Sequence, residues 1–257
     1  MTSLLVVDIG NTTIRLGLWD GVAVQEASAV PTGEVGRALE LGARLLEVAS
    51  GRRPGAALST VVPGAEAAWE RWCQQRRRPL FVVRGDTRTP LINRYRQPER
   101  LGPDRLAGAV AAVRRRGAPV IVVHLGTATV VDAVSERREY LGGAIVAGVD
   151  TGLAALAEET AGLPRVEARL VPGPIGPDTE TGLRAGASFG AAALVEGMVA
   201  RLRRAVGRQA PVVMTGGHAD LVAACLDEPL ASEHEVAPTL VLEGIGAIWE
   251  YRQSQEG

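Results

Sequence analysis

The sequence predicts an α/β protein composed of two related halves. Short runs of apolar, β-branched residues alternate with longer segments in which apolar residues recur at helical spacing. In addition, one order of elements occurs twice: a buried strand, a turn that begins at a glycine, and a second strand. The first copy is centred on Gly10 and the second on Gly126. This weak internal repeat divides the chain into expected halves of residues 1–116 and 117–257.

The expected elements of each half follow from these periodicities and from the turn residues between them. In the first half we expect strands at residues 3–7, 14–18, 57–62 and 80–83, with helices at 35–49, 65–75 and 104–116. A polar connection over residues 84–102 is long enough to suspect a function. In the second half we expect strands at residues 119–123 and 212–214, a hairpin near 136–139, and helices at 153–160, 179–206 and 242–251.

Composition excludes several classes of protein. The chain has 257 residues, of which 46% are hydrophobic and 22% are charged, as is typical of a globular protein. The net charge of −1 gives no electrostatic reason to expect nucleic acid or an acidic membrane as a partner. No stretch approaches the roughly 18 uncharged apolar residues of a membrane span, and the N-terminus lacks the pattern of a signal peptide. Two distant cysteines without metal-ligand spacing fit a reducing compartment, so we expect a cytoplasmic protein.

Two glycine turns have the composition of phosphate-binding loops. The chain lacks the Gly-x-x-x-x-Gly-Lys-Ser/Thr sequence of P-loop enzymes, but backbone N–H groups at a glycine turn can approach phosphate oxygens because no Cβ intervenes. Small hydroxyl residues add donors, and Asp8 adds a carboxylate suited to Mg²⁺. Two such turns in equivalent positions predict an ATP cleft between the halves, lined by Asp8, Gly10, Asn11, Thr12, Thr13, Gly126, Thr127 and Thr129.

Two further segments admit both a functional and a structural interpretation. Gly216 and Gly217 follow a strand and would let the backbone pass close to a flat ligand such as adenine, or else form only a strand-to-helix turn. Asp104 opens a helix, where it either caps the N-terminus or takes a proton from a hydroxyl nucleophile. Its neighbour Arg105 either binds a phosphate or a carboxylate through its planar fork or forms a surface salt bridge.

Together these segments resemble the type III pantothenate kinase family. The matching pieces are short, but their order and spacing extend over nearly the whole chain. They comprise Asp8–Thr12, Leu58–Pro63, Tyr95 with Pro98, Gly102–Arg105, Gly126–Thr129 with Asp132, Gly142–Ile145 with Gly148, Leu163–Pro164, Thr179 with Gly186, and Thr215–Gly217.

The resemblance implies a fold, an activity and partners. The fold is the one shared by acetate kinase, sugar kinases, Hsp70 and actin: two similar actin-like, ribonuclease H-like halves, each a mixed β-sheet flanked by helices, with ATP between them. The implied activity is the ATP-dependent phosphorylation of pantothenate to 4'-phosphopantothenate, the first step of coenzyme A biosynthesis. The resemblance also implies Mg²⁺ with ATP, a monovalent cation (K⁺ or NH₄⁺), and a homodimer with pantothenate bound near the subunit interface.

The resemblance further implies roles for individual residues. Asp104 is the expected base for the pantothenate hydroxyl, and Asp8 is expected to handle Mg²⁺ and phosphate. The pantothenate pocket is expected to be completed by Thr179 of the partner subunit. Its other expected members are Tyr95, Gly102, Pro103 and Arg105.

The chain departs from the family's pattern at three positions. His124 stands where the family usually has the aspartate of its cation site, Ala147 where proline is common, and Gly108 where asparagine is common. Imidazole, with a reference pKa of about 6.5, is neutral or positive and cannot hold a cation as a carboxylate does. Two alternatives therefore stay open: a catalytically impaired, nucleotide-binding paralogue with a regulatory role, and a kinase of the same fold with another acceptor.

Overall fold

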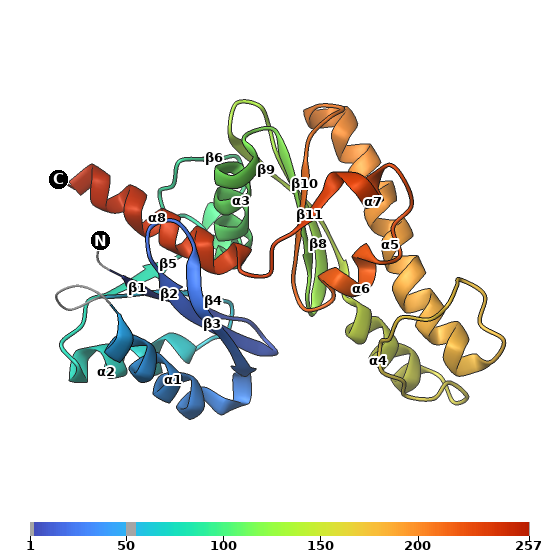
Figure 1. Cartoon of the computed structure of the whole chain (residues 1–257), viewed down its shortest axis with the longest axis horizontal. Coiled ribbons are helices and arrows are strands. Elements are labelled where there is room, and N and C mark those ends of the chain that lie inside the picture. Colours follow the sequence, from blue (N-terminus) through green and yellow to red (C-terminus); the bar gives the residue numbers. More distant parts are fainter. Residues whose placement is uncertain (1–2, 50–54, 257) are drawn as a thin grey trace. The chain divides into compact units, whose positions relative to one another are not determined.

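The computed structural model describes residues 3–49 and 55–256 (Figure 1). Its contacts divide the chain into two compact units. The first comprises Met1–Arg115, Arg138–Tyr140 and Thr239–Gly257, and the second comprises Arg116–Arg137 and Leu141–Pro238. The change of unit after Arg115 lies beside the expected boundary at residue 116. The C-terminal segment, expected in the second half, instead groups with the first unit.

The first unit is built on a mixed five-stranded sheet in the order β3-β2-β1-β4-β5. The central strand β1 pairs antiparallel with β2 and parallel with β4. All six residues of β1 are buried, which accounts for its almost unbroken apolar run. The strands are β1 (Leu4–Ile9), β2 (Thr13–Trp19), β3 (Val24–Pro31), β4 (Ala56–Thr60) and β5 (Leu80–Val83).

Helices cover both faces of this first sheet. Alternate residues of β1, namely Leu5, Val7 and Ile9, pack in one core with α1 and α2. On the opposite face α8 lies against β1 and β2, and a Cβ added to Gly246 of α8 would lie 2.5 Å from the indole of Trp19. The helical segments are η1 (Thr32–Glu34), α1 (Val35–Val48), α2 (Ala65–Gln75), η2 (Pro98–Arg100), α3 (Pro103–Arg116) and α8 (Leu240–Glu256).

The second sheet has the order β11-β10-β7-β8-β9-β6. Its strand β7 pairs antiparallel with β8 and parallel with β10. The edge strand β6 pairs with Glu139 and Tyr140, the residues of β9 that group with the first unit. The strands are β6 (Ile92–Asn93), β7 (Val120–Leu125), β8 (Ala128–Val134), β9 (Glu139–Ala147), β10 (Val212–Thr215) and β11 (His234–Val236).

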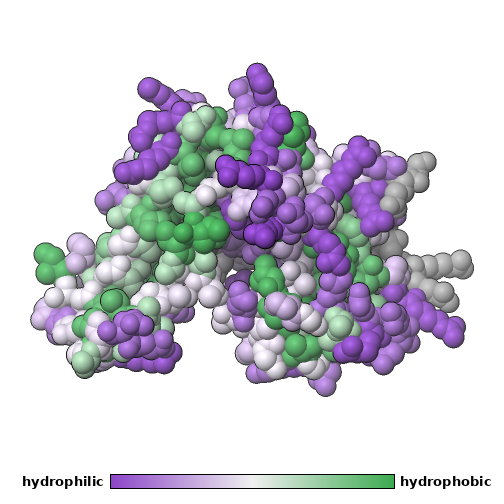
Figure 2. Space-filling view, turned by 180° about the vertical axis from the view of Figure 1, so that it is seen from behind, coloured by the Kyte–Doolittle hydropathy of each residue, from purple (hydrophilic) through white to green (hydrophobic). Residues whose placement is uncertain are grey.

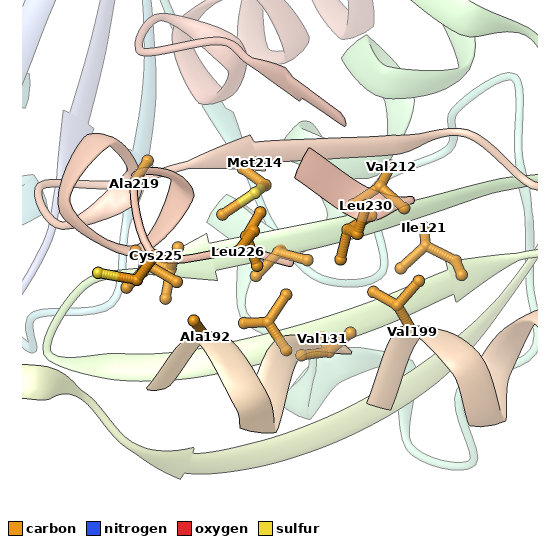
Figure 3. Close-up of a cluster of buried hydrophobic side chains, with 14 of the residues drawn as sticks. Ile121, Val131, Ala192, Val199, Val212, Met214, Ala219, Cys225, Leu226 and Leu230 are labelled. Carbon is orange, nitrogen blue, oxygen red and sulfur yellow. The ribbon is translucent and has the colours of Figure 1, made fainter. Parts of the chain in front are cut away.

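The core of the second unit lies between this sheet and the long helix α5 (Figure 3). Val131 of β8, Met214 of β10 and Val199 of α5 meet in one buried cluster. The cluster extends to the short segment around α6, where Cys225 is buried as a free thiol. The helices of this unit are α4 (Val149–Glu159), α5 (Thr179–Val206), α6 (Ala219–Ala223) and α7 (Leu230–Glu233).

The two sheets share one strand order, which confirms the internal repeat. The order β3-β2-β1-β4-β5 corresponds to β9-β8-β7-β10-β11. The hairpin turns differ in length, however. Ile9 pairs with Ile14 across residues 10–13, whereas Leu125 pairs with Thr129 across residues 126–128, so the second turn is one residue shorter.

The remaining differences from the sequence expectations concern strand β3 and several short elements. The eight-residue edge strand β3 was not predicted, because most of its residues are exposed and carry no regular apolar alternation. Helices α2 and α5 and strand β5 have the expected bounds, but α4 begins at Val149 rather than at residue 153. The sequence did not predict β6, α7, β11 or the two 3-10 turns, each of which has at most four residues and therefore too little periodicity to detect. In the described part of the chain, no helix is long and apolar enough to cross a membrane.

Candidate active site

The turn between β1 and β2 is braced by a threonine from the end of the hairpin. The Gly10 N–H donates to the Thr13 carbonyl at 3.0 Å, which closes the turn. Thr32 then secures it twice, because its hydroxyl donates to the Gly10 carbonyl at 2.7 Å and its N–H donates to the Thr12 carbonyl at 3.0 Å. Asn11 and Thr12 are left exposed at the tip. The turn is therefore a fixed loop with two polar residues directed to solvent.

Asp8 lies in a row of three polar side chains that crosses the first sheet. Its register partner on β2 is Arg15, and its register partner on β4 is Ser59. Directly paired residues of adjacent strands project from the same face, so all three side chains share the face opposite α1 and α2. Asp8 is only 6% exposed and Ser59 is fully buried. The row sits where β1 enters the turn.

The buried position of Asp8 changes its acid–base behaviour. The pKa of Asp8 is raised to about 7, mainly by burial and in addition by the charge of Asp104. The hydroxyl of Ser59, which has no other hydrogen-bond partner in the described chain, and the charge of Arg15 act in the opposite direction. Two carboxylates in one partly desolvated place repel each other, so the pair favours a proton or a cation between them.

Asp104 occupies the first turn of α3. The helix begins at Pro103, so the structure corrects the interpretation of Asp104 as the N-cap. The Oδ1 atom of Asp104 is buried and has no hydrogen-bond partner among the described residues. A Cβ on Gly102 would lie 2.5 Å from this oxygen, so glycine is what lets the carboxylate fold back at the helix start. An unsatisfied buried carboxylate oxygen is costly unless a ligand completes it.

Arg105 and two tyrosines form a corner beside Asp104. Arg105 is 8% exposed, and its guanidinium lies 5.5 Å from the centroid of the Tyr95 ring. The Tyr95 ring in turn lies 6.4 Å from that of Tyr140. Asn93 holds the backbone in place, because its Oδ1 accepts from the Tyr95 N–H at 2.9 Å and its Nδ2 donates to the Gly85 carbonyl at 2.9 Å. The polar connection over residues 84–102 thus holds Tyr95 in a fixed position.

The second unit contains a different glycine turn, between β7 and β8. The Gly126 N–H donates to the Ala128 carbonyl at 3.1 Å. The Thr127 carbonyl accepts from the Gly148 N–H at 3.0 Å and from the Thr151 hydroxyl at 2.7 Å, so the start of α4 braces the turn. A Cβ on Gly148 would lie 2.6 Å from the Thr127 carbonyl oxygen, which explains a glycine there.

A third turn, after β10, lies against the second one. Gly216 has φ +107°, and a Cβ there would lie 2.5 Å from the carbonyl carbon of Leu125. The His218 N–H donates to the Leu125 carbonyl at 3.1 Å, and the His218 side chain pairs with Asp150 of α4 at 3.2 Å. His124 precedes Leu125 on β7 and has Val130 and Thr215 as its register partners. No carboxylate stands in the row that corresponds to Arg15, Asp8 and Ser59.

A cavity of about 670 Å³ opens between α4 and α5 in the second unit. Its lining is mostly apolar, and both Thr129 and the exposed Thr179 border it. Along α5 the lining residues include Gly182, Gly186 and Gly190, which are spaced by four residues and therefore lie on one helix face. The size is that of a small-molecule pocket or of a groove for another chain.

Comparisons with known proteins decide the family. The family model described as type III pantothenate kinase matches residues 4–201, about three quarters of the chain. The chain belongs to the type III pantothenate kinase family. It is 35% identical to the type III pantothenate kinase of Brevibacillus brevis, with 98% of this chain and 100% of the relative covered. It is 37% identical to that of Roseiflexus sp. strain RS-1, with the same two shares covered.

Solved structures of distant proteins share the fold of this chain. Component A of (R)-2-hydroxyglutaryl-CoA dehydratase from Acidaminococcus fermentans matches with a TM-score of 0.58 at 18% identity, covering 99% of this chain and 100% of that one. MreB 5 of Spiroplasma citri bound to AMPPNP matches with a TM-score of 0.54 at 7% identity, covering 99% and 98%. At such identities the likeness concerns the fold alone, and it confirms the expected actin-like architecture.

The residues expected to form the sites of a type III pantothenate kinase are divided between the two units. The first unit holds Asp8, the turn of residues 10–13, Tyr95 and residues 102–105. The second unit holds His124, the turn of residues 126–129, Gly216 and Gly217, and Thr179. Thr179 is thus placed with Thr129 at the cavity of the second unit.

Sequence reasoning missed three side chains at these sites. Arg15 is the only charged residue of β2, and a charge inside an otherwise apolar strand was the available signal. Tyr140 is fully buried beside Tyr95, but the contact joins residues 45 positions apart and leaves no local pattern. Asp150 was missed for the same reason, since its ion pair with His218 at 3.2 Å joins distant parts of the sequence.

Among the described residues, the carboxylates of Asp8 and Asp104 are the candidate donors for a metal ion. A kinase of this family uses ATP together with a divalent metal. In the described part of the chain no group of three or more His, Cys, Asp or Glu side chains is arranged to hold a metal ion. Asp8 and Asp104 nevertheless fit a hard cation that binds one or two carboxylates and takes its other ligands from phosphate and water, as Mg²⁺ does.

Proposed function

We propose that this chain transfers the γ-phosphoryl group of ATP to the hydroxyl of pantothenate and so forms 4'-phosphopantothenate, the first step of coenzyme A biosynthesis. Family membership supports the reaction. The observation that supports the roles of individual residues is that the charge of Asp104 acts on Asp8, which lies beside the glycine turn of the first unit. This pair joins an unsatisfied buried oxygen to a carboxylate that favours a proton or a cation.

In the proposed mechanism Asp104 is the catalytic base. The acceptor hydroxyl oxygen forms a bond to the γ-phosphorus as the bond from that phosphorus to the β,γ-bridging oxygen breaks. The hydroxyl proton passes to the Asp104 carboxylate, and ADP leaves with the bridging electron pair. Since phosphoryl transfer depends mainly on alignment and charge stabilisation, the fixed place of Asp104 at the helix start matters more than its basicity.

Asp8 is the proposed residue for Mg²⁺. Bound Mg²⁺ would neutralise phosphate charge, which is the chemistry a divalent cation supplies in phosphoryl transfer. Asn11, Thr12 and Thr13 of the same turn, with Gly10, are proposed to border the phosphates. The bracing of the turn by Thr32 supports this proposal, because a preorganised loop loses little entropy on binding.

The corner of Arg105 and Tyr95 is the proposed pantothenate pocket, with Gly102 and Pro103 at its edge. Pantothenate carries a carboxylate, and a buried guanidinium held against an aromatic ring suits a planar, bidentate anion. Asp104 lies between Pro103 and Arg105 in the sequence, so the proposed base and the proposed pocket share the start of α3.

The second unit is proposed to contribute the rest of the ATP site through Gly126, Thr127, Thr129, Gly216 and Gly217. The two braced turns support this proposal, since Gly148 and Gly216 both permit close backbone approach. His124 is the proposed site of the family's monovalent cation, K⁺ or NH₄⁺. Because an imidazole replaces a carboxylate there, we expect a weak dependence on that cation.

The proposed assembly is a homodimer in which the partner's Thr179 completes the pantothenate pocket. The exposed apolar residues of the second unit support an interface. They include Leu141, Ile145 and Val146 on β9 and Leu156 on α4. Hydrophobic surface gathers at the left of Figure 2, on the side of this unit. Patches of this kind on globular proteins mark interaction sites. The glycines of α5 would let a second helix approach closely.

The alternatives are less well supported. A paralogue with a purely regulatory role would not require Asp104 beside Asp8, and a kinase for another acceptor would not require the Tyr95 and Arg105 corner. We place the reaction in the cytoplasm, because Cys73 and Cys225 are both free thiols.

The direct experiment is a coupled assay of ADP release by the purified chain. ATP, Mg²⁺ and pantothenate are supplied, K⁺, NH₄⁺ or Na⁺ is varied, and pantothenate is omitted in the control. We expect ADP release that depends on pantothenate. A folded protein that binds nucleotide but releases no ADP under any cation would overturn the proposal in favour of the regulatory paralogue.

A further inference from the structure

The C-terminal helix α8 lies between the first sheet and α3, the helix that carries Asp104 (Figure 1). Residues 240–248 of α8 are all buried, as are residues 105–113 of α3, so neither helix has a solvent-facing side over these stretches. One side of α8 packs against β1 and β2. Another side contacts α3, so α8 connects the sheet that carries Asp8 with the helix that begins beside Asp104.

Two glycines bring α8 close to its neighbours on opposite sides. They are Gly244 and Gly246, which lie two positions and therefore about 200° apart around the helix. A Cβ on Gly246 would meet the indole of Trp19 on β2, whereas a Cβ on Gly244 would lie 2.9 Å from the Cα of Ala107 on α3 and closer still to its carbonyl group. Because this second neighbour is backbone, no change of rotamer could make room. The contact between the two helix backbones thus fixes their separation.

Ala107 belongs to the same helical turn as Asp104. The two positions are three residues apart, so a shift of the backbone at Ala107 also moves the carboxylate. The turn is followed by Gly108, and a glycine inside a helix constrains the backbone less than alanine would. The buried Oδ1 of Asp104 has no hydrogen-bond partner among the described residues. The place of this oxygen therefore depends on how the first turn of α3 is packed.

A buried ion pair joins the same two helices near the other end of α3. Arg115 donates to the two carboxylate oxygens of Glu243 at 2.6 and 2.7 Å, and the Thr239 hydroxyl donates to the same carboxylate at 2.7 Å. Glu243 is only 7% exposed, and breaking a buried pair is costly because it leaves an uncompensated charge. Since Glu243 directly precedes Gly244, the pair holds α8 at a fixed position along α3.

We propose that α8 is a spacer that positions the catalytic base, with Gly244 and Glu243 as positioning residues for Asp104. The inference rests on the proposed function, because it requires Asp104 to accept the proton of the acceptor hydroxyl. Phosphoryl transfer depends on alignment, and a misplacement of about 1 Å can cost about a hundredfold in rate. Close-packed interiors transmit such displacements. Because neither residue touches a ligand, their substitution should lower kcat and leave the binding of nucleotide and pantothenate nearly unchanged.

The test is a double-mutant cycle between Gly244→Ala and Asp104→Asn. The added methyl group meets the backbone of α3, so we expect Gly244→Ala alone to lower kcat about ten- to a hundredfold. The dissociation constant of AMPPNP and the KM for pantothenate should stay within about threefold of the wild type. In the Asp104→Asn background no base remains to be displaced, so the same substitution should change the residual kcat by less than about twofold. Initial rates and titration calorimetry measure these quantities.

The matched control is Gly42→Ala on α1. Gly42 is also a buried helix glycine of the first unit, but its Cβ would meet the side chains of Leu5 and Trp69 at 3.3 and 3.4 Å, on the face of the sheet opposite α8. We expect its kcat to stay within about twofold of the wild type, whatever its stability in urea. If Gly244→Ala does not fold, Glu243→Gln, which keeps the shape of the side chain and removes its charge, is taken through the same cycle. Its expected loss of kcat is about three- to tenfold.

Three results would overturn the inference. The first is an unchanged kcat in Gly244→Ala, or in Glu243→Gln where that variant replaces it. The second is an equal loss with and without the Asp104 carboxylate, which would mean a general effect on the structure. The third is a loss of the same size in Gly42→Ala.

Failure of the inference can be separated from failure of the proposed function. A wild-type chain without pantothenate-dependent ADP release would overturn both. Retained turnover in Asp104→Asn would overturn the role of the base and, with it, the spacer role of α8. A large loss in Asp104→Asn together with full turnover in Gly244→Ala would overturn the spacer role alone.

Discussion

The two glycine turns have the same place in two sheets of the same strand order, yet they differ in chemistry. In the first, Asp8 lies between Arg15 and Ser59, and Asp104 is close enough to raise its pKa. In the second, His124 lies between Val130 and Thr215. The row of side chains at the first turn thus contains an arginine and an aspartate, whereas the corresponding row at the second turn contains neither.

The two turns are also held in place by different contacts. Thr32 secures the first turn from η1, directly after β3, and Asn11 and Thr12 at the tip of the turn are exposed. The second turn is packed against the start of α4 through the Thr127 carbonyl. A repeated backbone can therefore carry different side chains in its two copies. In the proposed mechanism the first copy serves the chemistry of transfer and the second helps to hold the nucleotide.

The largest expected effect comes from the base of the first unit. Asp104→Asn should lower kcat by about 10²–10⁴, because an amide cannot accept the hydroxyl proton. The affinity for AMPPNP should stay within a few-fold of that of the wild type. Initial rates and calorimetry measure the two quantities. Asp86→Asn, which alters an exposed carboxylate of the same connection, is the control and should retain full turnover. Retained turnover in Asp104→Asn would remove Asp104 from the mechanism.

The next effect tests the close packing of the second turn. Gly148→Ala places a methyl group against the Thr127 carbonyl and should destabilise the protein by about 1–3 kcal/mol. It should also weaken AMPPNP, because the turn must shift. Urea unfolding and calorimetry measure these changes. Gly162→Ala is the control, since a Cβ there meets nothing within 4 Å. Unchanged nucleotide affinity in Gly148→Ala would mean that the second turn does not border the ligand.

A third prediction concerns the pH dependence of stability. The folded pKa of Asp8 is raised to about 7, so the native state binds a proton that the unfolded state loses near its ordinary value of 3.8. Stability therefore falls as the pH rises from about 4 through the folded pKa of about 7, above which the buried carboxylate is ionised in both states. Asp8→Asn removes this penalty and should stabilise the ligand-free protein by about 1–3 kcal/mol at pH 8.5.

Asp20, in the same unit, is expected to affect the pH dependence of stability in the opposite direction from Asp8. The pKa of Asp20 is lowered by hydrogen bonds from the backbone N–H groups of Ala23 and Val22, so its ionised form stabilises the fold above its ordinary pKa. Asp20→Asn should therefore lower the free energy of unfolding at pH 8.5, whereas Asp8→Asn should raise it. Urea unfolding at pH 5 and 8.5 measures both. A loss of stability at pH 8.5 in Asp8→Asn would contradict the account of the buried carboxylate pair.

The smallest effect is expected at His124. His124→Asp restores a carboxylate to the second turn and should raise turnover modestly while increasing its dependence on K⁺ or NH₄⁺ over Na⁺. Initial rates in the three salts measure the change. If no cation dependence appears, another group of the chain performs the task that the family assigns to that position.

How far the sequence predicted the structure depends on whether a feature is local. The helices α2 and α5 were predicted with their bounds because their periodicity and end residues lie within the segment itself. The repeat was visible because Gly10 and Gly126 follow buried strands. The placement of α8 in the first unit was not visible, since it depends on contacts such as that of Gly246 with Trp19, made across more than two hundred residues.

The same distinction applies to the candidate site. Asp8, Asp104 and both turns could be proposed from short motifs. Arg15 and Tyr140 could not, because their importance arises only from strand register and from a ring contact that the fold creates. Their roles follow from which acceptors and partners surround them, and a sequence alone does not specify those surroundings.

The proposed difference in role between the two turns is tested most directly by the turnover of a matched pair of variants, Asp8→Asn and His124→Asn. Each replaces the equivalent residue of one turn by the same amide, and both are assayed for pantothenate-dependent ADP release under identical salt conditions. The account predicts a loss of about a hundredfold or more for Asp8→Asn and a change of no more than a few-fold for His124→Asn. Losses of similar size in the two variants, or a larger loss in His124→Asn, would contradict it.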